Sequence, residues 1–158
     1  MTNALFVFHL GQQLFALPVG QVATVVPRAT LTPLPGAPAD LIGLLRLHGA
    51  LCPVIDIRAR LGLDVAVPHI GECIVVMHTA TFRVGLLIEG IAGVVAPPLD
   101  PRDGPGPIDP DRLIRGVLEV SGQVVATLDA EAVVGHEVRA YLAATADGLR
   151  GHAGQTAA

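Results

Sequence analysis

The amino-acid sequence contains one pattern twice, and this duplication constrains the fold more than any other feature. Residues 41–62 read LIGLLRLHGALCPVIDIRARLG, and residues 113–135 read LIRGVLEVSGQVVATLDAEAVVG. Two glycines and one aspartate recur at a constant spacing: Gly43, Gly49 and Asp56 return as Gly116, Gly122 and Asp129. Aliphatic residues fill the space between them. A chain with two similar halves is expected to fold as two similar units.

The segments that precede these stretches, residues 4–26 and 73–97, also match each other. Their apolar residues align pairwise: Phe15 with Val84, Leu17 with Leu86, Val19 with Ile88, Val22 with Ile91, and Val25 with Val94. Alternation of apolar residues with a period of two is typical of β-strands, and Gly11-Gln12-Gln13 marks a turn. Each segment therefore predicts a β-hairpin. The second half is longer by about four residues, which the Pro- and Gly-rich residues 96–112 accommodate as a loop.

Two more strands follow the loop in each half, and each pair closes at a turn that contains glycine. They are predicted at residues 41–47, 50–57, 113–120 and 123–128. Each half thus supplies about four or five short strands, the size of a small barrel. Helical periodicity is scarce: residues 56–63 are a candidate for one short turn of helix, and residues 129–144 fit an amphipathic helix with four inward positions: Val133, Val134, Val138 and Leu142. The predicted fold class is all-β with a minor helix, followed by a disordered tail at residues 147–158.

Composition excludes several classes of protein. The sequence is 51% hydrophobic and only 15% charged, as expected of a well-packed globular body. The net charge is −4 and every basic residue is arginine, so no basic stripe favours nucleic acid. No apolar run is long enough to span a bilayer, and no basic residue precedes Leu5 to start a signal peptide. We expect a cytoplasmic protein in which Cys52 and Cys73 stay reduced.

Motifs of catalysis and of metal or nucleotide binding are missing from the sequence. Cys52 lies in an apolar strand without the neighbours that would activate a thiol. No glycine-rich loop opens a helix, so the nucleotide-binding motifs are absent. Asp56 and Asp129 end equivalent strands, where carboxylates usually cap the turn that follows. The histidines lack metal-ligand spacing: His9, His48, His69, His78, His136 and His152. We therefore predict no enzymatic activity, no metal and no cofactor.

Four segments, taken in order, resemble the CheW family of bacterial chemotaxis coupling proteins. They cover residues 6–26, 32–63, 83–95 and 113–129. The most specific part runs from Gly43 to Arg58 and ends in Pro-Val-Ile-Asp-Ile-Arg. The resemblance implies one CheW-like domain over residues 1–146, built from two packed SH3-like five-stranded β-barrels. The barrel subdomains would cover roughly residues 12–70 and 71–136, with an exchange of the N-terminal strand between them left open.

The same resemblance implies an adaptor that couples methyl-accepting chemoreceptors to a chemotaxis-type histidine kinase. Such a protein pairs with the CheW-like regulatory domain of the kinase and holds the receptor's cytoplasmic tip between its barrels. It would be cytoplasmic and recruited to membrane receptor arrays through its partners. By resemblance, the kinase-binding residues are Val22, Thr24 and Val25. The residues of the receptor groove or the inter-barrel region would be Arg46, His48, Gly49, Val84, Leu86 and Glu89.

The sequence departs from the family at two of these places. It has Arg46-Leu47-His48-Gly49 where the family has Asn-Leu-Arg-Gly, and Thr24 where family members often have Glu. An imidazole and a guanidinium cannot make the same contacts, which favours an accessory system such as the control of type IV pili. His48 also has a structural interpretation, as a polar residue at a turn. The alternative function is a decoy or a structural subunit of another signalling complex that has lost one binding surface.

Overall fold

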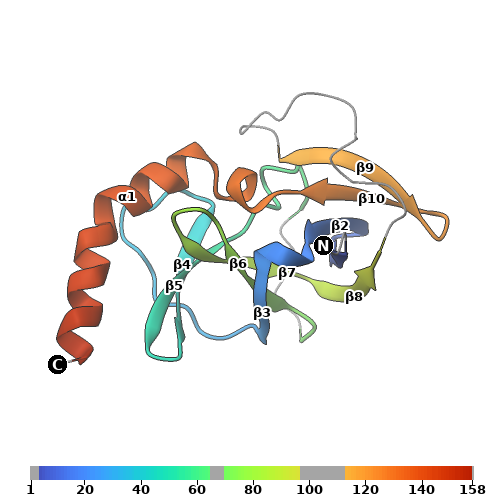
Figure 1. Ribbon diagram of the computed structural model, residues 1–158. Coiled ribbons are helices and arrows are strands. Elements are labelled where there is room, and N and C mark those ends of the chain that lie inside the picture. Colours follow the sequence, from blue (N-terminus) through green and yellow to red (C-terminus); the bar gives the residue numbers. More distant parts are fainter. Residues whose placement is uncertain (1–3, 65–69, 97–112, 158) are drawn as a thin grey trace.

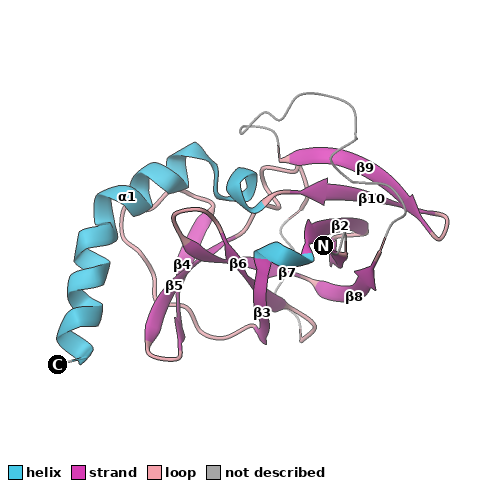
Figure 2. Cartoon of the chain, in the orientation of Figure 1, coloured by secondary structure: helices cyan, strands magenta, loops and turns pink. Residues whose placement is uncertain are grey.

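The computed structural model describes residues 4–64, 70–96 and 113–157, which form two five-stranded sheets and one long helix (Figures 1 and 2). Sheet A consists of β1 (Leu5–Leu10), β2 (Gln13–Pro18), β8 (Gly90–Val95), β9 (Ile114–Val120) and β10 (Gln123–Leu128). Sheet B consists of β3 (Val22–Pro27), β4 (Leu41–Leu47), β5 (Ala50–Ile55), β6 (Cys73–His78) and β7 (Arg83–Ile88). A 3-10 turn, η1 (Val19–Gln21), joins β2 to β3, and α1 (Ala130–Ala157) follows β10. The prediction of an all-β fold with a minor helix is confirmed.

The two sheets have the same topology. Sheet A has the strand order β8-β1-β2-β10-β9, and sheet B has the order β3-β6-β7-β5-β4. If five is added to each strand number of sheet A, counting on from β10 to β1, the result is the strand order of sheet B. The parallel pairs also correspond, since β2 lies beside β10 and β7 lies beside β5. The repeat seen in the sequence is therefore a repeat of β1–β5 by β6–β10.

Each repeat gives its first hairpin to the sheet of the other repeat. The hairpin β1–β2 completes sheet A with β8, β9 and β10, and the hairpin β6–β7 completes sheet B with β3, β4 and β5. The subdomain ranges expected from the sequence, 12–70 and 71–136, therefore do not coincide with the sheets. One whole hairpin of each repeat lies in the sheet formed mainly by the other repeat. Both parallel pairs therefore join strands of different repeats.

The exchanged hairpins are the most deeply buried strands. In β1, every side chain except that of His9 is buried, and in β7 every side chain after Arg83 is buried. A strand covered on both faces needs apolar residues at successive positions, which explains the nearly uncharged N-terminal region. Gly85 in β7 also fits its neighbours closely, since a Cβ there would lie 2.6 Å from Cγ2 of Ile74.

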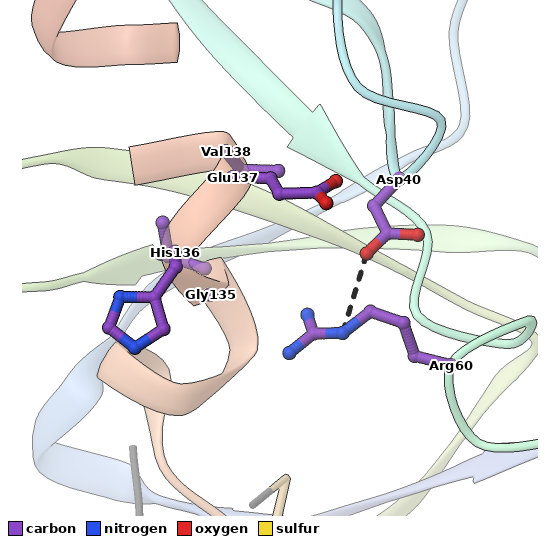
Figure 3. A pocket seen from close by; sticks show the side chains of 7 residues that line it. Asp40, Arg60, Gly135, His136, Glu137 and Val138 are labelled. Carbon is purple, nitrogen blue, oxygen red and sulfur yellow. Dashed lines mark ion pairs between the residues drawn. The ribbon is translucent and has the colours of Figure 1, made fainter. Parts of the chain in front are cut away.

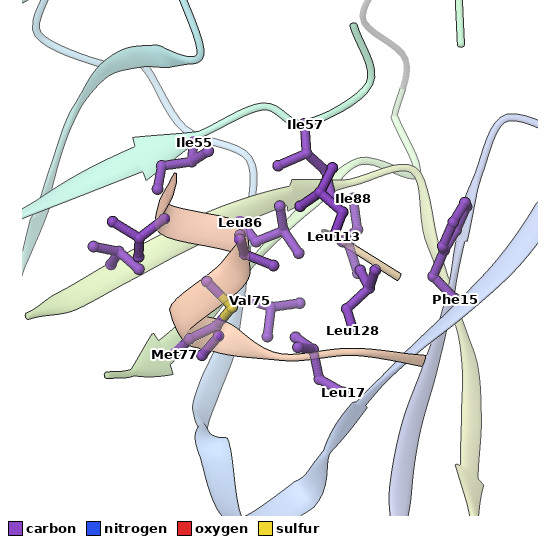
Figure 4. Close-up of a cluster of buried hydrophobic side chains, with 14 of the residues drawn as sticks. Phe15, Leu17, Ile55, Ile57, Val75, Met77, Leu86, Ile88, Leu113 and Leu128 are labelled. Atoms are coloured by element: carbon purple, nitrogen blue, oxygen red, sulfur yellow. The ribbon is translucent and has the colours of Figure 1, made fainter. Parts of the chain in front are cut away.

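The largest hydrophobic cluster lies between the two sheets and joins them into one body (Figure 4). Sheet A contributes Phe15 and Leu17, and sheet B contributes Val75 and Leu86, all of them at most 1% exposed. Two smaller clusters each belong to one sheet. Because the main core is shared, neither sheet can bury its apolar face without the other.

The helix α1 packs on this shared core through its first turns. Its predicted inward residues are all buried: Val133, Val134, Val138 and Leu142. The helix is kinked at Gly135, whose φ of 74° lies in the left-handed region. The sequence predicted a disordered tail from residue 147, whereas in the structure α1 continues to Ala157.

Candidate functional site

The predicted kinase-binding residues lie on β3, an edge strand of sheet B. Within the described residues, β3 pairs only with β6. Val22 and Val25 are half-buried and pack against the shared core, and the register shifts between Val22 and Thr24, which leaves Ala23 as an exposed bulge. The other edge of β3 presents backbone groups and small side chains. Such an edge can pair with another protein.

The equivalent edge strand of sheet A, β8, exposes larger apolar side chains. Ile91 is 52% exposed and Val94 is 63% exposed, although both align with half-buried residues of β3. Sequence reasoning did not single them out as site residues, although the repeat itself had already aligned them with Val22 and Val25. The chain therefore has two equivalent edges, of which that of β8 is the more apolar.

The predicted residues Arg46, His48 and Gly49 lie at the end of the β4–β5 hairpin. All three are exposed. His48 has φ 50° and Gly49 has φ 80°, and the corresponding turn between β9 and β10 has 53° and 80° at Ser121 and Gly122. Positive φ at both central residues is typical of a tight two-residue hairpin turn. His48 thus has a structural role as a turn residue and still presents its imidazole to solvent.

Val84 and Leu86 of β7 lie in the interior. Both are 0% exposed and belong to the cluster between the sheets, where Figure 4 shows Leu86 among side chains of both sheets. They are inter-barrel residues, and neither side chain is accessible to a partner in this structure. Their effect on any binding surface must therefore be exerted through packing.

Glu89 lies where the chain crosses from β7 in sheet B to β8 in sheet A, and it contacts a group of buried charges. Its Oε2 accepts the backbone N–H of Gly11 at 2.7 Å and lies 3.7 Å from Nη1 of Arg58. Arg58 is 2% exposed and donates to Asp56 through Nε at 3.0 Å and Nη2 at 2.8 Å. Hydrogen bonding to Asp56 raises the pKa of the Arg58 guanidinium. Glu72, also buried, lies 3.6 Å from Arg58 Nη1. We call this group the Arg58 junction.

A corresponding group forms at the crossover from β2 to β3, and we call it the Gln21 junction. Gln21 Nε2 donates to Oδ2 of Asp129 at 3.0 Å, and Gln21 Oε1 accepts the backbone N–H of Ala130 at 3.0 Å. Arg115 Nη1 donates to the same Asp129 oxygen at 2.6 Å. Sequence reasoning assigned no contacts at either crossover. The recurring aspartates were the available signal, since Asp56 belongs to one junction and Asp129 to the other.

A surface pocket of about 440 Å³ lies beside the kink of α1 (Figure 3). Arg60 pairs with Asp40 at 3.4 Å and donates to the carbonyls of Val133 and Ala132, in the turn that precedes the kink. Burial raises the pKa of Asp40, and Arg60 opposes that rise. The polar groups of this wall therefore serve mainly to hold the helix against sheet B.

Comparison with known proteins decides the family. The profile of the CheW-like domain matches residues 4–138. The chain is 31% identical over 140 residues to chemotaxis protein CheW of Rhizobium meliloti (strain 1021), an alignment that covers 85% of this chain and 89% of that protein. The chain belongs to the CheW-like domain family.

A second named relative and one solved structure are also similar to this CheW-like chain. It is 26% identical over 93 residues to protein PilI of Pseudomonas aeruginosa, covering 59% of this chain and 52% of that protein. The crystal structure of the scaffolding protein TtCheW from Thermoanaerobacter tengcongensis superposes with a TM-score of 0.76 at 20% identity, covering 87% of this chain and 91% of that one. The CheW-like fold is therefore common to both chains.

Cys52, the thiol that the sequence offered as a candidate nucleophile, is buried in this CheW-like domain. Burial raises the pKa of Cys52 to about 11, so its thiol is protonated at neutral pH. The described residues contain no group of three or more His, Cys, Asp or Glu side chains that could hold a metal ion. Neither α1 nor η1 is long and apolar enough to cross a bilayer. The exposed features of the described chain include the edges of β3 and β8 and the hairpin turn at His48.

Proposed function

We propose that this protein is a non-catalytic adaptor of bacterial chemosensory signalling, which couples chemoreceptors to a histidine kinase. The observation that carries the proposal is the CheW-like match over residues 4–138, together with 31% identity to a chemotaxis protein CheW. The protein acts in the cytoplasm and reaches the membrane through its partners. Its function is to hold two proteins in a fixed arrangement.

The first partner in this proposal is the CheW-like regulatory domain of the kinase, which docks on the edge of β3. The exposed bulge at Ala23 and the half-buried Val22 and Val25 support this assignment, because they combine a free strand edge with an apolar surface. The second partner is the cytoplasmic tip of a chemoreceptor, which docks near the exposed hairpin turn at Arg46 and His48.

A test of the kinase surface uses the repeat as its own control. Binding of the purified chain to the regulatory domain of each chemotaxis-type kinase from the same organism is measured by calorimetry. Ala23→Glu places a charge on the edge of β3, and Ala92→Glu places the same charge at the equivalent exposed position of β8. We expect Ala23→Glu to weaken binding roughly tenfold or more, and Ala92→Glu to weaken it much less. Equal losses in the two variants would refute docking on β3.

A second candidate is an accessory chemosensory system such as the one that controls type IV pili. The relationship to protein PilI favours it, together with Thr24 and His48 at positions where the family carries Glu and Arg. Selective binding to the kinase of such a system would place the chain there. His48→Arg and Thr24→Glu are then expected to shift the preference toward the main chemotaxis kinase.

Binding to both partners at once separates the adaptor from a decoy. An adaptor binds both the kinase domain and a receptor fragment, in one ternary complex that elutes together by size-exclusion chromatography. A chain that binds one partner and excludes the other is a decoy or a subunit of a different complex. If the folded chain binds neither partner, the adaptor proposal is wrong.

A further inference from the structure

Each sheet has a second edge strand, opposite β8 in sheet A and opposite β3 in sheet B, and these two edges differ. The strands are β9 in sheet A and β4 in sheet B, which occupy equivalent places in the repeat. In the part of the chain that the structure describes, β10 is the only strand that pairs with β9, and β5 is the only strand that pairs with β4. What lies beyond each strand therefore decides whether its edge is open.

The edge of β4 is closed by the chain itself. Thr32 and Leu44 exchange two backbone hydrogen bonds, at 2.9 Å and 2.8 Å, in an antiparallel bridge outside the named strands. Gly43 makes room for this segment, since a Cβ there would lie 2.8 Å from Cβ of Leu31. The side chain of Leu44 is only 5% exposed. A partner strand could not pair with Leu44 without displacing these residues.

The edge of β9 is open toward the residues that the structure describes, none of which pairs with its outer side. Val117, the equivalent of Leu44, lies opposite Ala126 as Leu44 lies opposite Pro53. The backbone N–H and C=O of Val117 therefore point outward, as those of Leu44 do toward its bridge partner. The side chain of Val117 is 56% exposed, and that of Val124 on β10 is 66% exposed. An apolar edge of this kind can pair with another chain.

The charges of β9 favour a second copy of this chain as the partner. Arg115 lies two residues before Val117, and Glu119 lies two residues after it. When two β9 strands pair antiparallel about a two-fold axis at Val117, each Arg115 lies opposite Glu119 of the other copy. Opposite charges at directly opposed positions stabilise an antiparallel pair. Arg115 donates to Asp129 through Nη1, and its guanidinium has further N–H donors for a second carboxylate.

We propose that two copies of this chain associate through β9, which pairs antiparallel with β9 of the second copy about an axis at Val117. Sheet A of one copy then continues into sheet A of the other, and the two Val117 side chains meet at the axis. The edge of β3 and the hairpin turn at His48 both belong to sheet B. The dimer therefore does not rest on the kinase and receptor contacts proposed above.

The mass of the full-length protein in solution tests the proposal. Sedimentation velocity over a range of micromolar concentrations should show the mass rising from that of one chain toward that of two. Val117→Glu places two like charges at the axis and should weaken association roughly tenfold or more. The matched control is Val94→Glu, at a residue of β8 that is 63% exposed, and it should leave association unchanged.

Charge reversal tests the register of the pair. Glu119→Arg and Arg115→Glu each place like charges opposite one another, so each variant alone should associate roughly tenfold more weakly. A mixture of the two variants restores opposite charges at both positions and should associate about as tightly as the unmodified chain. Loss in both variants without rescue in the mixture would overturn pairing about Val117. A chain that stays monomeric at every concentration, or equal effects of Val117→Glu and Val94→Glu, would overturn the dimer.

A cross-link provides a second route that leaves the charges of β9 in place, in case Arg115→Glu does not fold. In the background of Cys73→Ser, Val117→Cys should form a disulfide-linked dimer on mild oxidation. Opposed residues of a hydrogen-bonded antiparallel pair have Cα atoms about 5.5 Å apart, which suits a disulfide. Val124→Cys is more exposed but lies off the axis, so it should cross-link much less. Equal yields at the two positions, or no cross-link at Val117→Cys, would refute the proposal.

Discussion

Asp56 and Asp129 occupy equivalent positions in the two repeats and form the same local hydrogen bond. Oδ1 of each accepts the backbone N–H two residues further on, from Arg58 at 3.0 Å and from Glu131 at 2.9 Å. Each also pairs with an arginine, Asp56 with Arg58 and Asp129 with Arg115. The arginines differ in burial, since their side chains are 2% and 18% exposed. The aspartate–arginine pair is therefore expected to contribute differently to stability in the two repeats.

Asp56→Asn is expected to destabilise the protein more than Asp129→Asn. Removing the charge of Asp56 leaves Arg58 buried without its main partner, which should cost about 2 to 3 kcal/mol of unfolding free energy. Arg115 can turn to solvent, so Asp129→Asn should cost only about 1 kcal/mol, mainly because the amide nitrogen that replaces one carboxylate oxygen cannot accept from Gln21 or Arg115. Urea unfolding measured at neutral pH checks the order. Equal costs would show that the burial of Arg58 has no energetic consequence.

Gly85→Ala is expected to destabilise the core of sheet B. Its Cβ would lie 2.6 Å from Cγ2 of Ile74 and 3.3 Å from Cγ2 of Val54, and neither neighbour is at a free surface. Overpacking of this kind costs about 1 to 3 kcal/mol. Gly20→Ala is the control, because a Cβ there meets nothing within 4 Å. Thermal unfolding should show a lower midpoint for the first variant and a nearly unchanged one for the second.

Asp40→Asn is expected to stabilise the protein slightly at neutral pH. Burial raises the pKa of Asp40 in the folded state above the usual 3.8, so the fold binds a proton more readily than the unfolded chain does. Stability from this group is present below pH 3.8 and is lost as the pH rises through the folded-state pKa. The variant should therefore gain less than about 1 kcal/mol at pH 7 and nothing near pH 3. A gain that persists at pH 3 would contradict this origin.

The two cysteines are expected to react with thiol reagents at very different rates. Cys52 is buried and has a pKa of about 11, whereas Cys73 is partly exposed. At pH 8 only about one Cys52 thiol in a thousand is ionised, and access is limited as well. Mass spectrometry after a short treatment with iodoacetamide should find Cys73 modified and Cys52 intact. In Cys73→Ser the native protein should take up almost no label until urea unfolds it.

The sequence predicted the hairpins, the duplication and the inward face of the helix, because these depend on local periodicity. It left open an exchange of the N-terminal strand, but it did not predict that each repeat gives a whole hairpin to the other sheet. Parallel pairing of β2 with β10 joins Phe15 to Ala126, and no local pattern in either strand specifies its partner. The alternation of apolar residues determines which face of a strand is buried, and leaves its neighbours undetermined.

The Arg58 junction escaped sequence reasoning for a related reason. Arg58 was visible in the motif Pro-Val-Ile-Asp-Ile-Arg, but its partners follow later in the chain, Glu72 just before β6 and Glu89 between β7 and β8. An arginine is usually exposed, so its burial depends on three carboxylates that only the folded chain brings together. Val84 and Leu86, which the family resemblance associated with the receptor groove or the inter-barrel region, lie in the core between the sheets.

The reciprocal exchange of hairpins sets an order for folding on the ribosome. Sheet B needs no strand beyond β7 and can close once residue 88 has emerged, whereas sheet A includes the first hairpin and must wait for β10, near residue 128. The strands β1 and β2 are thus synthesised first, but their partners β8 and β10 are synthesised late. Until then, the apolar β1–β2 hairpin is without its sheet, and contacts so distant in sequence slow folding. A nascent chain of this kind is most exposed to aggregation while its second half is being translated.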